Sequence, residues 1–146
     1  MPLLNYTTKI DGAKTVSEIQ KVLSEHGATK ILFEYTNEGY IESMSFTVET
    51  PSGTMPIRLP CDWRPVLKIL ENDGKFPRSL KKKDQAIRVA WRIVKDWVEA
   101  QMAILETRMV TVDQIFLPYM PTANGQTLYE RMIDTKFQLL EANPPQ

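Results

Sequence analysis

The hydrophobic pattern is clearest between Asp84 and Arg108, a stretch without proline or glycine. It is rich in residues with high helix propensity, which predicts one continuous helix about 37 Å long. Apolar residues recur along it at helical spacing in two stripes. They are Ile87, Trp91, Val94, Val98, Met102 and Leu105 in one stripe, and Ala86, Ala90, Ile93, Trp97, Ala100 and Ile104 in the other. A helix this apolar is expected to be buried on most of its circumference, by its own domain, by a partner subunit, or by both.

The two apolar stripes leave a narrow polar strip along the same helix, which spans roughly 60° of arc. Its members are Arg88, Arg92, Lys95, Glu99 and Glu106. The cations come first along the strip and the carboxylates last.

The chain before the long helix carries shorter patterns. They predict a short strand over Leu3 to Ile10, a helix from a Thr15-x-x-Glu18 capping box to Gly27, and strands over Lys30 to Tyr35, Tyr40 to Thr50 and Met55 to Leu59. Tight turns at Asn37-Glu38-Gly39 and Pro51-Ser52-Gly53 separate the three later strands. These three strands are therefore expected to form an antiparallel meander.

Further short helices are predicted on both sides of the long one. Asp62 can cap a helix that continues to about Glu71. Capping boxes open helices at Thr111, which Pro118 ends, and at Thr127, which continues to about Leu140. Residues 142–146 are expected to be a frayed tail.

Together the elements predict an α+β fold, in which an antiparallel meander of three or four strands packs on one long central helix with several short helices around it. The length of 146 residues is typical of one domain with a sizeable core, so we expect residues 1–146 to form a single domain. No apolar run is long enough for a membrane span, and the N-terminus lacks the pattern of a signal peptide. We therefore expect a cytoplasmic protein without a membrane contact.

The zero net charge hides an uneven distribution of charged residues. Residues 58–95 hold eleven basic and four acidic side chains, a net charge of +7, whereas residues 1–57 and 96–146 carry −3 and −4. A basic block inside a neutral chain favours a local anion site or a charge-matched contact over general polyanion binding.

The sequence offers no catalytic or cofactor signature. His26 is the only histidine and precedes Gly27 at a predicted helix end, where an imidazole favours the negative end of the helix dipole. Cys61 is the only cysteine, and one histidine with one cysteine cannot supply a zinc site. Gly-rich phosphate loops and dinucleotide fingerprints are missing. We therefore expect neither enzyme activity nor a bound cofactor.

Several cations of the basic block fall on one face of the long helix or at its entry: Lys81, Arg88, Arg92 and Lys95. Arg58 ends a predicted strand, and Trp63 lies beside Arg64 at the start of a short helix. Guanidinium groups suit phosphate, and aromatic faces suit bases. The structural alternative is a solvated strip whose cations pair with carboxylates of the flanking segments.

Some short motifs resemble a family of mostly unannotated small proteins from bacteriophages and prophages. The resemblance rests on Trp91-Arg92, Glu106, Phe116-Leu117 and Gly125-Gln126-Thr127, and near the N-terminus on Tyr6-Thr7-Thr8-Lys9, Thr15 to Ile19 and His26-Gly27-Ala28. Lys95 and Lys81 to Lys83 depart from the family's pattern. Small phage proteins of this type include anti-defence sponges, which sequester nucleotide immune signals made by bacterial cGAS-like or TIR enzymes.

We therefore expect a non-enzymatic phage accessory protein that binds a small phosphorylated nucleotide, of the cyclic nucleotide or ADP-ribose type. The alternatives are a nucleic-acid-binding protein and a structural or adaptor protein with a protein partner. A homo-oligomer with the long helix at its interface is also expected. The candidate ligand site has Arg92, Arg88 and Lys95 as phosphate contacts and Arg58 and Trp63 as neighbours.

Overall fold

The structure is a computed structural model that describes residues 3–140, so the tail expected at 142–146 lies outside the described residues. The fold is α+β, as the sequence predicts. Its elements, in chain order, are α1 (Gly12–Glu25), β1 (Ala28–Tyr35), β2 (Ile41–Thr50), β3 (Gly53–Arg58), α2 (Trp63–Asn72), the 3₁₀ turn η1 (Arg78–Leu80), α3 (Lys83–Glu106), α4 (Val112–Phe116), the 3₁₀ turn η2 (Leu117–Tyr119) and α5 (Leu128–Asp134).

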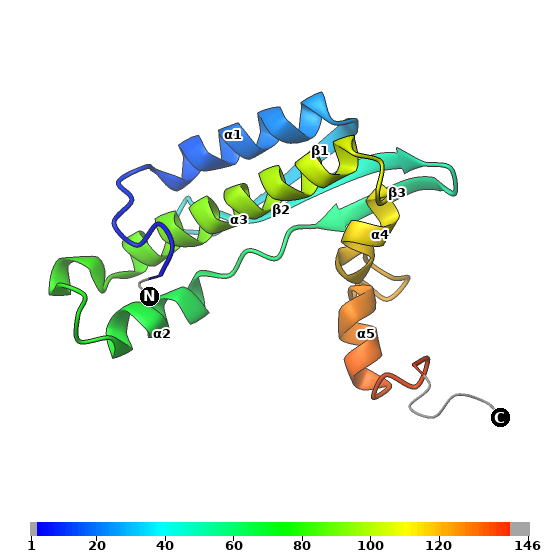
Figure 1. The fold of residues 1–146 in the computed structure, drawn as a ribbon. Coiled ribbons are helices and arrows are strands. Elements are labelled where there is room, and N and C mark those ends of the chain that lie inside the picture. Colours follow the sequence, from blue (N-terminus) through cyan, green and yellow to red (C-terminus); the bar gives the residue numbers. More distant parts are fainter. Residues whose placement is uncertain (1–2, 141–146) are drawn as a thin grey trace.

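The sheet is a three-stranded antiparallel meander in the order β1-β2-β3. The alternation predicted for β2 holds, because Met44, Phe46 and Val48 are buried while the residues between them are partly exposed. Helices α1 and α3 run side by side across one face of this sheet (Figure 1). The main core lies between these two layers.

Helix α3 organises the fold and has nearly the predicted bounds, from Lys83 to Glu106. Nine of its residues are buried, and they come from both predicted apolar stripes and from the start of the helix. One stripe packs into the main core, while Ala86 packs against α2 in a second cluster with Leu70 and Phe76. Much of the cover that we expected from a partner subunit is thus supplied by α1, α2 and the sheet. The oligomeric state remains a prediction.

The strand predicted at Leu3 to Ile10 is wrong, since this segment forms turns and makes no strand pairing. Its backbone carbonyls are bound by a side chain of α3. The amide nitrogen of Gln85 donates to the carbonyl oxygens of Tyr6 and Thr8, at 2.9 Å each. The segment therefore lies against the helix and does not extend the sheet.

The capping box predicted at Thr15 is also wrong. Helix α1 begins earlier, at Gly12, with Asp11 at the N-cap position. Thr15 lies inside the helix, fully buried, where its hydroxyl contacts the carbonyl oxygen of Asp11. The Thr-x-x-Glu pattern arises here because both side chains face the neighbouring helix α3.

The C-terminal part follows the sequence pattern at its helix starts but not at its end. The capping boxes at Thr111 and Thr127 are both present. Helix α5, however, stops at Asp134 and does not reach Leu140, because Lys136 and Phe137 adopt positive φ angles of 55° and 57°. Residues 128–140 extend away from the sheet and from α2 (Figure 1).

Candidate functional site

The cation on which the predicted site was centred, Arg92, is held inside the protein. Its guanidinium Nη1 forms an ion pair with Glu18 of α1 and also donates to the Thr15 hydroxyl at 3.4 Å. Only 14% of the Arg92 side chain is exposed. This arrangement matches the structural alternative, in which Arg92 pairs with a carboxylate of another segment and joins two helices.

Lys95, one turn further along the polar strip, is also paired. Its ammonium lies 2.9 Å from the carboxylate of Glu99, four residues on. The stem of the lysine is mostly covered, with 16% of the side chain exposed. A phosphate at this position would have to compete with a carboxylate that is already in contact.

Arg88 differs from both. It forms no ion pair with any carboxylate of residues 3–140, and its single side-chain hydrogen bond runs from Nη1 to the amide oxygen of Gln85 at 3.4 Å. The side chain lines a hollow of about 110 Å³. Of the three predicted phosphate contacts, Arg88 is the one that faces a cavity with its charge unneutralised by an ion pair.

This hollow continues into a second one of about 220 Å³, and the two share Asp11, Gly12, Tyr40 and Ile87. We call the combined cavity the hairpin groove, because it lies between the start of α1, the β1–β2 turn and the first half of α3. Its other lining residues are Ala13, Tyr35, Gly39, Ile41, Asp84, Arg88 and Trp91. Each of the two hollows is smaller than the roughly 300–1,000 Å³ of a small-molecule site, so a ligand of that size must span both.

Gly12 leaves room for the groove. A Cβ atom at this position would lie 3.3 Å from Cδ1 of Trp91 and 3.7 Å from Cγ2 of Ile87. Most side chains here would therefore push against α3 or fill the cavity. The glycine lets the start of α1 approach α3 closely and leaves its backbone open to the groove.

Two long helices begin at or near the groove. Gly12 and Ala13 open α1, Asp84 belongs to the first turn of α3, and neither N-cap side chain makes a capping hydrogen bond. Free amides at a helix start carry a partial positive charge. The carboxylates of Asp11 and Asp84 oppose this charge, so the groove combines anion-attracting and hydrogen-bond-accepting groups.

Trp63, another predicted site residue, lies next to this region. The ammonium of Lys83 sits 4.9 Å from the ring centroids of both Trp63 and Tyr40, and 3.1 Å from the carboxylate of Glu38. Hydrogen bonds with Tyr40 and with Glu38 raise the pKa of Lys83. Tyr40 thus forms a wall between the Arg88 hollow and the Lys83 contact.

Arg58 is not part of this constellation. It is the last residue of β3, where its backbone lies opposite Ser45 of β2 in the sheet. Its positive charge helps to lower the pKa of Glu130 in the C-terminal segment. The backbone hydrogen bond with Thr127 is the main reason for the lowered pKa of Glu130, with Arg58 a smaller one. The structure therefore brings Arg88 and Trp63 close to the same wall and leaves Arg58, Arg92 and Lys95 in other contacts.

Sequence reasoning missed Tyr35, Tyr40, Asp11 and Gly12. A usable signal was present, because Tyr35 and Tyr40 flank the predicted turn Asn37-Glu38-Gly39 and must lie together at the end of a hairpin. The sequence gives no comparable signal that Asp11 and Gly12 line the groove. It depends on how α1 packs against α3.

Within residues 3–140, no cluster of histidine, cysteine and carboxylate side chains could hold a metal ion. Burial raises the pKa of the Cys61 thiol to about 12, which disfavours the reactive thiolate. In the same part of the chain, no helix is long and apolar enough to cross a membrane. Comparison with protein-family models, curated proteins and solved structures finds no match to this chain.

Proposed function

We propose that this protein is a non-enzymatic binder of a small phosphorylated nucleotide, with the hairpin groove as its site. The observation that carries the proposal is the position of Arg88, a half-buried arginine that lines a cavity without a carboxylate partner among the described residues. A guanidinium in that setting can grip a phosphate through two parallel hydrogen bonds. Arg92 and Lys95 then act as scaffold beside the site.

The rest of the groove fits the other parts of a nucleotide. Tyr35 and Tyr40 offer aromatic faces on which a base can stack. The carboxylates of Asp11 and Asp84 can accept hydrogen bonds from ribose hydroxyls or exocyclic amines. A ligand with one anionic group and several donors suits this mixed lining better than a bare phosphate does.

The biological setting of the proposal comes from the resemblance to small phage proteins. We propose that the ligand is a nucleotide immune signal of the cyclic nucleotide or ADP-ribose type. Its sequestration in the cytoplasm of an infected bacterium would counteract anti-phage defence. The motifs that carry the resemblance include Trp91-Arg92, and Trp91 lines the groove.

The first experiment is to denature the purified protein and analyse the released small molecules by liquid chromatography and mass spectrometry. A nucleotide released in proportion to the protein supports the proposal. Calorimetric titration with cyclic dinucleotides, cyclic trinucleotides and cyclic ADP-ribose then tests the class directly. Absence of binding to every member of this set at about 100 µM protein, together with no released nucleotide, contradicts the proposed function.

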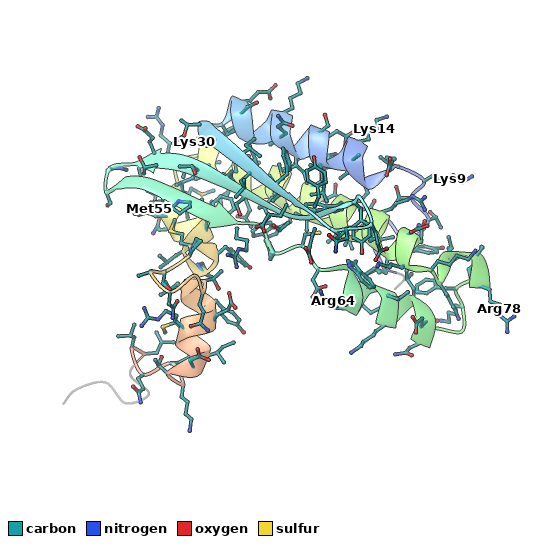
Figure 2. The ribbon with its side chains drawn as sticks, turned by 180° about the vertical axis from the view of Figure 1, so that it is seen from behind. Lys9, Lys14, Lys30, Met55, Arg64 and Arg78 are labelled. Atoms are coloured by element: carbon teal, nitrogen blue, oxygen red, sulfur yellow. The ribbon has the colours of Figure 1, made fainter. Side chains whose placement is uncertain are left out.

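Nucleic-acid binding is a second candidate, favoured by the exposed cationic end of the molecule. Arg64 and Lys68 on α2, and Lys75, Arg78 and Lys82 after it, are exposed there. Figure 2 shows Arg78 at the far end of the molecule and Arg64 nearer its middle, at the start of α2. A polyanion binder should hold random single-stranded oligonucleotides with an affinity that falls steeply as salt rises. Sub-micromolar binding of such oligonucleotides at physiological salt would favour this function over the first.

A further inference from the structure

The C-terminal segment from Leu128 to Leu140, which we call the C-terminal arm, has an apolar surface that the other described residues, 3–127, do not cover. Helix α5 contains no buried residue. Large exposed side chains lie along the arm, namely Tyr129, Ile133, Phe137, Leu139 and Leu140, with Leu139 78% and Leu140 65% exposed. A surface of this kind marks an interaction site on a soluble protein.

The backbone conformation of the arm is a second indication of an interaction site. Lys136 and Phe137 are consecutive non-glycine residues with left-handed φ angles, and both are exposed on more than a third of their surface. Such residues cost free energy and persist where surrounding contacts fix them. Within residues 3–140, the amides of Lys136 and Phe137 donate to the carbonyl oxygens of Ile133 and Met132, and the Phe137 ring contacts Tyr129.

We propose that the C-terminal arm is a dimerisation surface that packs against the same arm of a second copy of this chain. A two-fold interface uses one patch on both subunits, so the patch must complement itself. The arm meets this condition. It holds a hollow of about 340 Å³ lined by Leu128, Met132, Leu139 and neighbouring residues, and it exposes large apolar side chains that could enter the same hollow of a second copy.

The charges of the arm allow this pairing. Glu130 and Asp134 are balanced by Arg131 and Lys136, so two arms meet without net repulsion. A partner of opposite charge would instead be favoured by an excess of one sign. The neutral, apolar surface therefore fits a second copy.

The area available is enough for a small dimer interface, below the roughly 1,200–2,000 Å² of stable complexes. The five exposed apolar side chains present about 550 Å² per arm, if each exposes about 200 Å² when free. Two arms thus offer about 1,100 Å², which exceeds the roughly 1,000 Å² that a specific interface requires.

The test is the mass of the protein by light scattering and sedimentation across a concentration series. We expect a dimer. Ile133→Glu, which places like charges against each other across the two-fold axis, should raise the dimer Kd at least about tenfold. The matched control is Leu32→Glu, an even more exposed apolar position on the open face of the sheet, and it should leave the Kd unchanged.

Cross-linking tests the symmetry. A cysteine introduced as Ile133→Cys, with Cys61 replaced by serine, should form linked dimers with a short bis-maleimide. Leu32→Cys in the same background should not, because position 32 lies on the sheet and not on the arm. A monomer at all concentrations up to about 100 µM would overturn the proposal and leave the arm to a different partner. So would a dimer that Leu32→Glu disrupts and Ile133→Glu does not, since the interface would then be the sheet face.

Discussion

His26 at the end of α1 and Glu106 at the end of α3 are joined by a hydrogen bond of 2.8 Å between Nε2 and Oε1. The other ring nitrogen, Nδ1, lies 2.7 Å from the Val22 carbonyl oxygen. Both partners are acceptors, so both ring nitrogens must donate. The protonated imidazolium is the form that satisfies this geometry, and it also lies at the favourable end of the helix dipole.

This pair makes the stability of the fold depend on pH. The hydrogen bond with Glu106, helped by that with Val22 and by the charges of Glu106 and Glu25, raises the pKa of His26 above its ordinary value. Because the pKa of His26 is higher in the folded state, the pair stabilises the fold fully below the unfolded-state pKa of about 6.5. This stabilisation is lost as the pH rises through the folded-state pKa. Glu106→Gln should therefore lower Tm more at about pH 6 than at about pH 9.

The effect should stay below about 1 kcal/mol, because Glu106 is well exposed. Differential scanning fluorimetry across pH measures it. Glu25→Gln is the control, since Glu25 acts on His26 through charge without a hydrogen bond. Equal pH profiles for the parent chain and Glu106→Gln would show that the pair does not hold in solution.

Arg92 joins α1 to α3, and its removal should lower the free energy of unfolding. Arg92→Ala leaves the Glu18 carboxylate, which is partly covered, without its cation. We expect a loss of about 1–3 kcal/mol in the free energy of unfolding, measured by urea denaturation. Lys95→Ala, which removes only an i, i+4 pair, should cost less than about 0.5 kcal/mol.

A double-mutant cycle identifies the contact. If Arg92 acts through Glu18, then Glu18→Gln and Arg92→Ala should not be additive, with a coupling of at least about 0.5 kcal/mol. Additive losses, or an Arg92→Ala protein as stable as the parent, would remove Arg92 from the scaffold. The originally predicted ligand role for this residue would then regain weight.

The repeating patterns of the chain determined what the sequence could predict. The spacing of apolar residues predicts which face of an element is buried, because this spacing depends only on neighbouring residues. Examples are the alternation at Met44, Phe46 and Val48 and the helical spacing from Ile87 to Met102. The start of α1 was misplaced because Thr15 and Glu18 have the spacing of a capping box. In the fold their oxygen atoms serve Arg92, which lies 77 and 74 residues away.

The candidate site was harder to predict for the same reason. A polar strip identifies which cations share a helix face, but it does not say which of them meet a carboxylate from elsewhere. Arg92 and Arg88 look alike in the sequence, yet α1 presents Glu18 to the first and an open groove to the second. The distinction depends on the packing of distant segments.

Arg88 is the residue whose loss should affect binding rather than stability. Arg88→Ala removes one long hydrogen bond to Gln85 and should change the free energy of unfolding by less than about 0.5 kcal/mol. If Arg88 holds a phosphate, the variant should lose about 1.5–3 kcal/mol of affinity, or roughly 10- to 150-fold in Kd by calorimetry. Lys95→Ala is the matched control and should bind as the parent chain does.

Other results for Arg88→Ala and Arg92→Ala would place the phosphate contact elsewhere. If Arg88→Ala binds the nucleotide unchanged while Arg92→Ala stays as stable as the parent and loses it, the phosphate contact is Arg92. If neither variant changes the affinity, the ligand binds outside both positions. Each outcome is read from one titration and one denaturation curve per variant.

Phe116 anchors the C-terminal part to the core. The ring is fully buried and makes edge-to-face contacts with Phe46 at 5.5 Å and Trp97 at 5.8 Å between centroids. Phe116→Ala should cost about 3–5 kcal/mol in the free energy of unfolding, because it leaves a cavity between β2 and α3. The neighbour Leu117 is 48% exposed, and Leu117→Ala should cost well under half as much. Similar losses of unfolding free energy for both variants would mean that Phe116 does not pack against Phe46 and Trp97 as described.

Gly12 tests the groove by shape, without any change of charge. A Cβ at this position already lies 3.3 Å from Cδ1 of Trp91, so the branches of a valine must displace the indole or occupy the cavity. We expect Gly12→Val to destabilise the protein by about 1–3 kcal/mol through overpacking. We also expect it to weaken nucleotide binding even where the protein remains folded.

The control must show that a valine in α1 does not by itself affect binding, since valine has a higher helix propensity than the glycine it replaces. Ser17→Val lies on the exposed face of the same helix, where valine carries the same intrinsic preference but meets no neighbour in α3. It should retain binding and lose only a few tenths of a kcal/mol. If Gly12→Val binds the nucleotide as tightly as Ser17→Val does, the groove beside α1 is not the ligand site. The proposed role of Arg88 would fall with it, since both residues line the same hollow.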